Sequence, residues 1–288
     1  MGACKALIMA GAALIGPAAA ALAADLPPPP MVEMAPEPVD IGGWYLRGDA
    51  GVGFATGPDI RSTFADGYEV PDFHVDRESV GTAPFIGAGL GYAWNSWLRF
   101  DATGEYRFNH TFNAVESYDC ASFGCTNDKG DHRAFDKYVG SVESGVFLVN
   151  GYVDLGTWYG FSPFIGAGVG GAYHHLDGTS DHGIGGASGF GQGGFGNSSA
   201  KDQLNFAWAA MAGIDYSLTQ NLKLELGYRY LDMGTVRNNA IWCESGCSYE
   251  IQRVHLASHD VRLGLRWLFN DVTPVAPIYP PPPIVRKY

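Results

Sequence analysis

The sequence predicts an all-β fold, an eight-stranded antiparallel transmembrane β-barrel with short periplasmic turns and long extracellular loops. Three observations lead to this prediction. Apolar residues alternate with charged residues or glycine in segments of about ten residues. Aromatic residues gather near the ends of these segments. The links between the segments are alternately short and long. Membrane barrels combine these features because alternate side chains of each strand face lipid.

The clearest segment runs from Leu222 to Tyr230. Its even positions are leucine or tyrosine, and its odd positions are lysine, glutamate, glycine or arginine. Successive side chains of a strand point to opposite faces, so this pattern predicts a strand with one apolar and one charged face. A helix, at about 100° per residue, would scatter the apolar side chains around its axis.

Seven further segments alternate in the same way and complete the eight expected strands. They cover residues 44–54, 86–92, 98–108, 147–155, 165–170, 205–216 and 260–269. Short links are expected at 95–96, 156–160 and 219–221, and long extracellular loops near 56–82, 109–136, 174–204 and 234–257. A soluble β-sandwich also alternates and is the alternative fold. It does not account for charges of both signs on the polar faces or for links that alternate in length.

The chain divides into four predicted parts. Residues 1–23 are expected to be a signal peptide, with Lys5, an apolar run and a small-x-small motif ending at Ala23; an uncleaved membrane anchor is the alternative. Residues 24–42 form a Pro-rich periplasmic arm, 43–269 the outer-membrane barrel and 270–288 a Pro-rich periplasmic tail. Such proline runs favour polyproline II, either as a stiff spacer or as a contact for peptidoglycan or a periplasmic protein.

Charge and cysteine content narrow the partners and the compartment. The net charge of −12 opposes a nucleic-acid partner. Four cysteines follow the predicted signal as two close pairs, and an oxidising periplasm favours two local disulfides. The pairs are Cys120 with Cys125 and Cys243 with Cys247. A zinc site is the alternative, and it would require the two pairs to meet.

The charged faces of the predicted strands are expected to line the barrel. They carry seven basic residues, Arg47, Arg99, Arg107, Lys223, Arg229, Arg262 and Arg266, and seven acidic residues, Asp49, Asp101, Glu105, Asp154, Asp215, Glu225 and Asp260. A charge in a narrow lumen loses hydration and must be paired. An eight-stranded barrel is about as wide as its own filling side chains. We therefore expect an interior plug of ion pairs and little or no conductance.

The sequence indicates no enzyme. It has no Gly-x-Ser-x-Gly or His-Glu-x-x-His motif, and we expect no catalytic, cofactor-binding or metal-binding residues and no cofactor. His174, His175 and His182 share one predicted loop with Asp177 and Asp181, which is a set of metal-ligand types. The glycine-rich stretch that follows predicts a mobile loop and argues against a metal site. Loops on a rigid scaffold often carry binding function, so the outer loops are the favoured functional surface.

Several segments resemble one family. Gly43–Asp49, Val153–Gly160, Leu224–Tyr230 and His259–Arg266 are similar to the alphaproteobacterial outer-membrane β-barrel immunogenic surface proteins of the rhizobial and Brucella type, which are related to OmpA-like and opacity-type barrels. The resemblance implies a barrel in the outer membrane of a Gram-negative bacterium, with roles in envelope integrity and surface interaction. A small-solute porin-like channel is the alternative, and an outer-membrane enzyme is the third reading.

One expected partner follows from the resemblance. The last strand is similar to the signal that the barrel assembly machinery recognises, at Arg262, Gly264, Trp267 and Phe269. The further expected partners are outer-membrane lipid and lipopolysaccharide, peptidoglycan or a periplasmic protein at the Pro-rich tails, and a host surface at the loops.

Overall fold

The computed structural model of the protein describes residues 42–56, 60–64, 72–119, 132–184, 195–243 and 250–269. Within these ranges no helix is long and apolar enough to cross a membrane. The predicted signal peptide, both Pro-rich segments, and the side chains of Cys120, Cys125, Cys243 and Cys247 lie outside the described residues. The signal peptide, the tails and the disulfides therefore stay predictions.

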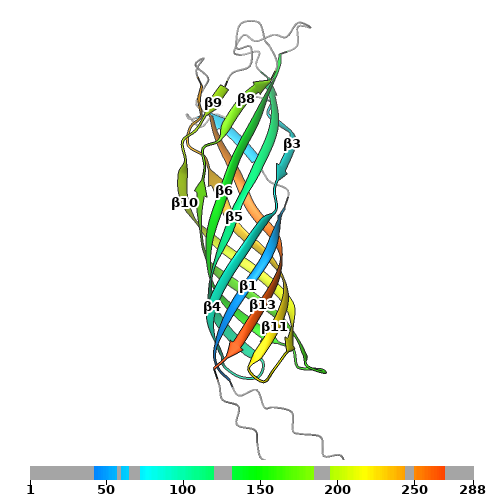
Figure 1. Cartoon of the computed structure of the whole chain (residues 1–288). Coiled ribbons are helices and arrows are strands. Elements are labelled where there is room, and N and C mark those ends of the chain that lie inside the picture. The colour runs from blue at the N-terminus through cyan, green and yellow to red at the C-terminus, as the bar shows by residue number, and fades with distance from the viewer. Residues whose placement is uncertain are drawn as a thin grey trace, which may run out of the picture. The chain divides into compact units, whose positions relative to one another are not determined.

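Eight strands form a closed antiparallel ring (Figure 1). In the order of the ring they are β1 (Gly43–Ala55), β4 (Ala83–Ala93), β5 (Leu98–Asp119), β6 (Arg133–Asp154), β7 (Phe161–Leu176), β10 (Lys201–Ser217), β11 (Leu222–Arg237) and β13 (Glu250–Leu268). The last strand returns to the first, with Tyr45 opposite Leu268, which closes the barrel. The predicted fold class is confirmed.

Three short turns join β4 to β5, β6 to β7 and β10 to β11 at one end of the ring. We call this the periplasmic end and the opposite end the extracellular end. Five short strands extend the wall at the extracellular end: β2 (Ile60–Phe64), β3 (His74–Val80), β8 (Ser180–Ile184), β9 (Phe195–Asn197) and β12 (Trp242–Cys243). They pair with β13, β5, β6, β8 and β9 respectively.

The barrel wall near the periplasmic end is apolar outside and charged inside. On β13, Leu263 and Leu265 are 53% and 49% exposed, whereas Arg262 and Arg266 are each 4% exposed. Exposed rings, among them Trp44, Trp97 and Trp267, stand at the strand ends. This arrangement is that of a membrane-spanning barrel with its apolar side toward lipid.

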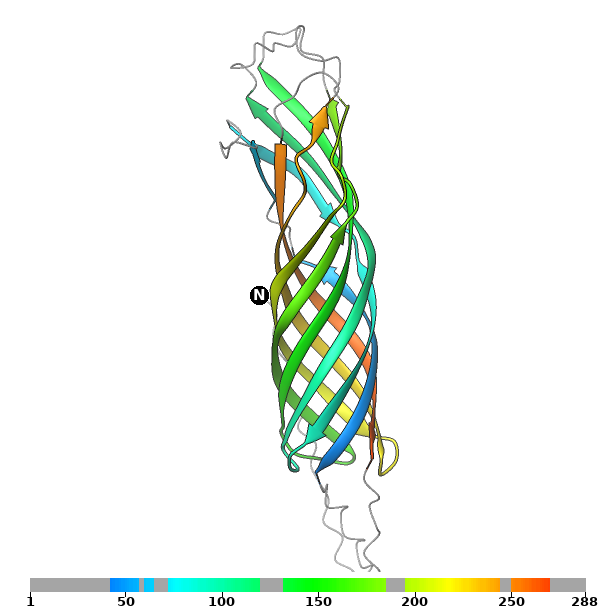
Figure 2. The ribbon, with the colours of Figure 1, turned by 90° about the vertical axis from the view of Figure 1, so that its left-hand side faces the viewer.

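The strands are longer than the sequence predicts. Two of the expected loops, 109–136 and 234–257, are largely strand, because β5 continues to Asp119, β6 begins at Arg133 and β13 begins at Glu250 (Figure 2). Beyond the lipid-facing belt water replaces lipid outside the wall, so the polarity of the two faces inverts. On β13, Val254 and Leu256 point inward and are buried, while His255 between them faces outward. We call this part of the wall the extracellular extension.

Candidate functional site

The lumen of the lipid-level barrel is filled by ion pairs. In a lower group, Arg47 donates hydrogen bonds to Asp49 at 2.7 Å, to Asp101 at 2.9 Å and to Glu225 at 2.8 Å. Arg262 reaches the same Glu225 at 2.8 Å. These charges come from β1, β5, β11 and β13, so the network ties strands together across the lumen.

The same lower group continues toward the periplasmic end. Arg99 contacts Asp154 at 3.1 Å and Asp215 at 3.7 Å, and Arg266 donates to Asp215. Aromatic rings fill the space between the charges, since the Arg99 guanidinium lies 4.2 Å from the centroid of the Tyr152 ring. Cation–π contacts of this kind stabilise a desolvated guanidinium.

An upper group of four charges lies nearer the extracellular end. Asp260, 0% exposed, accepts hydrogen bonds from Arg107 at 2.9 Å and from Arg229 at 2.6 Å. Glu105 contacts the same two arginines at 3.1 and 2.8 Å. The Phe85 ring lies 5.0 Å from the guanidinium carbon of Arg107 and 5.1 Å from that of Arg229, so both arginines of the upper group contact it.

Thirteen of the fourteen charges predicted to line the lumen take part in these two groups. They are Arg47, Asp49, Arg99, Asp101, Glu105, Arg107, Asp154, Asp215, Glu225, Arg229, Asp260, Arg262 and Arg266. The fourteenth, Lys223, is half-buried and stands opposite Arg266 at the periplasmic end. We call the two groups together the ion plug. Of the predicted assembly signal, Arg262 points into the plug, and Trp267 and Phe269 face outward.

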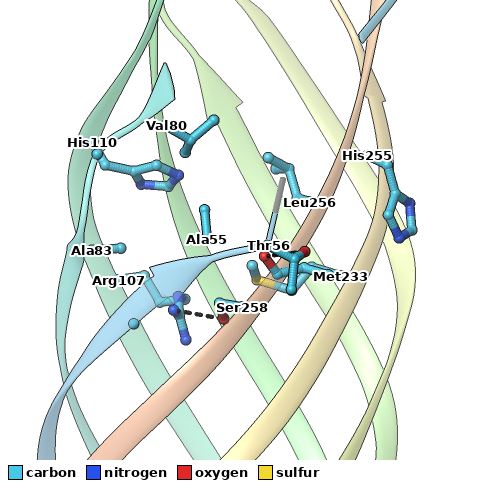
Figure 3. A pocket seen from close by; sticks show the side chains of 13 residues that line it. Ala55, Thr56, Val80, Ala83, Arg107, His110, Met233, His255, Leu256 and Ser258 are labelled. Atoms are coloured by element: carbon cyan, nitrogen blue, oxygen red, sulfur yellow. Dashed lines mark hydrogen bonds between the residues drawn. The ribbon is translucent and has the colours of Figure 1, made fainter. Parts of the chain in front are cut away.

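A small cavity lies directly above the ion plug (Figure 3). Arg107 and Ser258, joined by a hydrogen bond of 3.1 Å, lie on its lower side, and His110, Met233 and Leu256 are among its other lining residues. Its volume is about 20 Å³, which suffices for roughly one water molecule. Pockets for organic ligands are about 300–1,000 Å³, so this cavity does not hold an organic substrate.

The histidines that were candidates for a metal site do not come together. His174 is buried on β7, where its ring contacts Ser144 Oγ at 2.7 Å and the Met233 carbonyl at 3.2 Å. His175 faces outward and pairs with Asp202 at 2.6 Å. His182 stands exposed on β8. The expectation that they share a mobile loop is wrong, because two strands carry them and alternation sends His174 and His175 to opposite faces.

The extracellular extension holds four buried or half-buried acids, of which only Asp181 was considered in the sequence analysis, as a metal-ligand type beside the histidines. The four acids are Glu116, Asp136, Asp181 and Glu250. The sequence places them in predicted loops, where an acid is ordinarily solvated. Alternation with inward apolar neighbours, such as Ala114 beside Glu116, is the signal that could have found them.

A closed barrel with a lipid-facing apolar belt and an ion-paired lumen defines a β-barrel protein of the outer-membrane class. Residues 10–243 match the family model described as "Outer membrane protein beta-barrel domain". The chain belongs to this family, and its place is the outer membrane of a Gram-negative bacterium.

Relatives support the same assignment. An uncharacterised protein of Brucella abortus (strain 2308) is 35% identical over 235 residues, covering 76% of this chain and 78% of its own length. The outer membrane protein PagN of Salmonella typhimurium is 27% identical, covering 79% and 90%. A Rickettsia typhi protein that carries the word adhesin in its name is 27% identical, covering 78% and 87%.

Among solved structures, the outer membrane protein OprG from Pseudomonas aeruginosa matches with a TM-score of 0.43 and 18% identity, over 80% of this chain and 97% of OprG. The predicted Brucella-type membership is confirmed by the sequence relatives.

Proposed function

We propose that this protein is a non-enzymatic surface-interaction protein in which the ion-plugged barrel is an anchor and the extracellular extension presents a binding surface. The observation that carries the proposal is a group of exposed rings beyond the lipid-facing belt. Phe135 on β6, Phe195 on β9 and Trp242 on β12 are 39%, 52% and 67% exposed. Lipid does not account for them, because they lie in the extension.

The three rings share one wall of the extension. Strands β6, β8, β9 and β12 are consecutive neighbours in the sheet, and Trp242 stands opposite Asn197, two residues from Phe195. His182 on β8 packs its ring 5.1 Å from that of Phe195. Exposed aromatic side chains supply much of the energy of protein–protein interfaces. We call this wall the aromatic patch.

The ion plug favours an anchor over a channel. Ion pairs such as Arg107 with Asp260 and Arg47 with Glu225 span the lumen, and a solute would have to break them and leave buried charges unpaired. We expect the purified monomer to give no steady porin-sized openings in a planar bilayer. Such openings would favour the small-solute channel instead.

The surface role is tested by adhesion. A non-adherent Gram-negative host strain that displays the protein should bind cultured epithelial cells better than the same strain with an empty vector. The triple variant Phe135→Ala/Phe195→Ala/Trp242→Ala should lose most of this gain. Trp208→Ala is the matched control, because Trp208 is also an exposed ring, at 40%, but lies within the lipid-facing belt. Equal adhesion by the triple variant and the parent would contradict the proposal.

The remaining partners are proposals that follow from the predicted organisation. The Pro-rich segments 24–42 and 270–288 would lie in the periplasm and contact peptidoglycan or a periplasmic protein. The aromatic and aliphatic belt would contact lipid and lipopolysaccharide, and the last strand would be recognised by the barrel assembly machinery through Trp267 and Phe269. A co-sedimentation assay with peptidoglycan, with and without residues 270–288, tests the first of these contacts.

A further inference from the structure

Three carboxylates meet inside the extracellular extension. Asp136, Asp181 and Glu250 each offer an oxygen, and these oxygens all lie within 4.8 Å of one another. They come from β6, β8 and β13. Between β6 and β13 along the sheet stand β8, β9 and β12, so Glu250 approaches from across the lumen. We call these three residues, together with Glu116, the acidic cluster.

Glu116 belongs to the cluster by register. It stands directly opposite Asp136 in the β5–β6 pair, and directly opposite residues share one face of the sheet with Cβ atoms about 4.5–5.5 Å apart. Its side chain is 1% exposed, and within the described part of the chain its Oε1 has no hydrogen-bond partner. A buried carboxylate oxygen without a partner costs free energy. A ligand that bound this oxygen would therefore stabilise the fold.

Further polar side chains lie near the carboxylates or on the same inward face. Tyr138, 1% exposed, donates from its hydroxyl to Glu250 at 2.6 Å and stands opposite Asp181 in the β6–β8 pair. Gln252 is 2% exposed on the same inward face of β13 as Glu250, and among the described residues neither of its amide atoms has a hydrogen-bond partner. The Oδ1 atom of Asp181 is also buried and has no hydrogen-bond partner among the described residues.

The acidic cluster differs from the ion plug in that basic groups do not balance it. Burial, and then the charges of the other three acids, raise the pKa of Glu116 to about 9. Burial raises the pKa of Glu250 to about 8, of Asp181 to about 7 and of Asp136 to about 6. Within the described residues no arginine or lysine forms an ion pair with any of these four acids, whereas each acid of the ion plug has at least one.

The cluster lies outside the membrane. Along β13 the outward apolar residues end at Val261, and the next outward residue is His259. Glu250 is nine residues beyond His259, which corresponds to roughly 20 Å along the barrel axis for a tilted strand. The cluster is therefore within reach of ions in the external medium, as lipid-level groups are not.

We infer that the acidic cluster is a binding site for one hard divalent cation, Ca²⁺ in the first place, which closes the extracellular end of the barrel. Oxygen-only donor sets select hard cations. Ca²⁺ takes six to eight oxygens at about 2.3–2.6 Å, so two opposite ligands are up to about 5 Å apart, which accommodates the observed oxygens. Mg²⁺ prefers a near-octahedral shell at about 2.0–2.1 Å and is expected to bind more weakly.

The cation would add to the hydrogen bond that already joins Tyr138 on β6 to Glu250 on β13. Asp136 and Asp181 lie on the β6–β8 wall and Glu250 on β13 across the lumen. Binding therefore adds a cross-lumen link at the extracellular end, where the interior carries acids instead of ion pairs. The inference does not depend on the surface-interaction role, because it concerns the lumen and not the aromatic patch.

Terbium luminescence tests the site. The full chain is refolded in lipopolysaccharide-free detergent micelles and treated with EDTA, and Tb³⁺ is added while aromatic side chains are excited. Tyr138 beside Glu250 is placed to sensitise the ion. We expect a saturable signal with one ion per chain, displaced by Ca²⁺ with a Kd on the order of 10⁻⁴ M and less readily by Mg²⁺.

Two double variants with the same change in net charge complete the test. Asp136→Asn/Asp181→Asn should weaken Ca²⁺ binding at least tenfold. Asp177→Asn/Asp202→Asn removes two exposed acids near the same end and should leave the affinity unchanged. Both variants are checked for folding by heat-modifiable gel migration, and the first removes like-charge repulsion, so it is expected to fold. The inference is overturned by a parent chain without a saturable signal, or by equal affinities of the two variants.

Discussion

Asp260 is the interior charge whose loss should cost the barrel most. Its buried carboxylate accepts two hydrogen bonds from Arg107, both at 2.9 Å, and two from Arg229, at 2.6 and 2.9 Å. Asp260→Asn keeps the size of the side chain but leaves two buried guanidinium groups to share Glu105. Removing one partner of a buried pair costs about 3–5 kcal/mol. We expect about 3 kcal/mol, since Glu105 still contacts both arginines.

The measurement is a urea titration of the barrel refolded into lipid vesicles, with the folded fraction read from gel migration without boiling. Asp49→Asn is the matched control, because Arg47, which donates to Asp49, also keeps Asp101 and Glu225. It should cost about 1 kcal/mol. A loss below about 0.5 kcal/mol for Asp260→Asn, or equal losses for the two variants, would refute the view that the upper group holds the barrel closed.

Three further predictions concern packing, lipid exposure and pH. Gly170→Ala should destabilise the barrel by about 1–3 kcal/mol in the same titration, because its Cβ would clash with the Phe147 carbonyl oxygen. Gly48→Ala should be nearly neutral, because its Cβ would meet nothing closer than 4.0 Å. Leu263→Arg should cost about 2–4 kcal/mol at the lipid-facing belt, and Thr235→Arg, beyond the belt, less than about 0.5 kcal/mol. Each carboxyl of the acidic cluster has a raised pKa, about 6 to 9 against an ordinary value near 4. Protonation of these carboxyls therefore stabilises the extension, so their contribution is largest at low pH and is lost as pH rises through 6 to 9. In EDTA, amide exchange in β8 and the extracellular part of β13, corrected for intrinsic rates, should therefore be faster at pH 8.5 than at pH 5.5; a pH-independent rate would contradict this.

The lipid-level barrel could be predicted because lipid imposes one rule on every strand. Each outward residue must be apolar, so the inward residues stand out as charges or glycine. This rule identifies the face of Arg229 and of Asp260 from the sequence alone. It does not identify their pairing, because Arg229 meets Asp260 through the β11–β13 register and Glu105 across the lumen.

The extracellular extension escaped prediction because the rule changes there. Outside the membrane the outward side chains need not be apolar. On β13 the inward side carries the apolar Val254 and Leu256, while the outward side carries His255. The strand period of two persists through the change. A search for alternation of either polarity would have extended β13 well beyond Val261.

Predicting the acidic cluster also requires the position of a β-bulge, which no local sequence pattern shows. On β5 the inward residues have odd numbers up to Arg107 and even numbers from His110 onward, because the β5–β6 register shifts between these two residues. Such a bulge adds one residue and exchanges the two faces of the strand. It is this exchange that turns Glu116 into the lumen opposite Asp136, and the closure of the ring that brings Glu250 to them from the far wall. The residues of the ion plug can thus be predicted from the alternation within each strand, whereas the acidic cluster depends on one bulge and on the closure of the barrel.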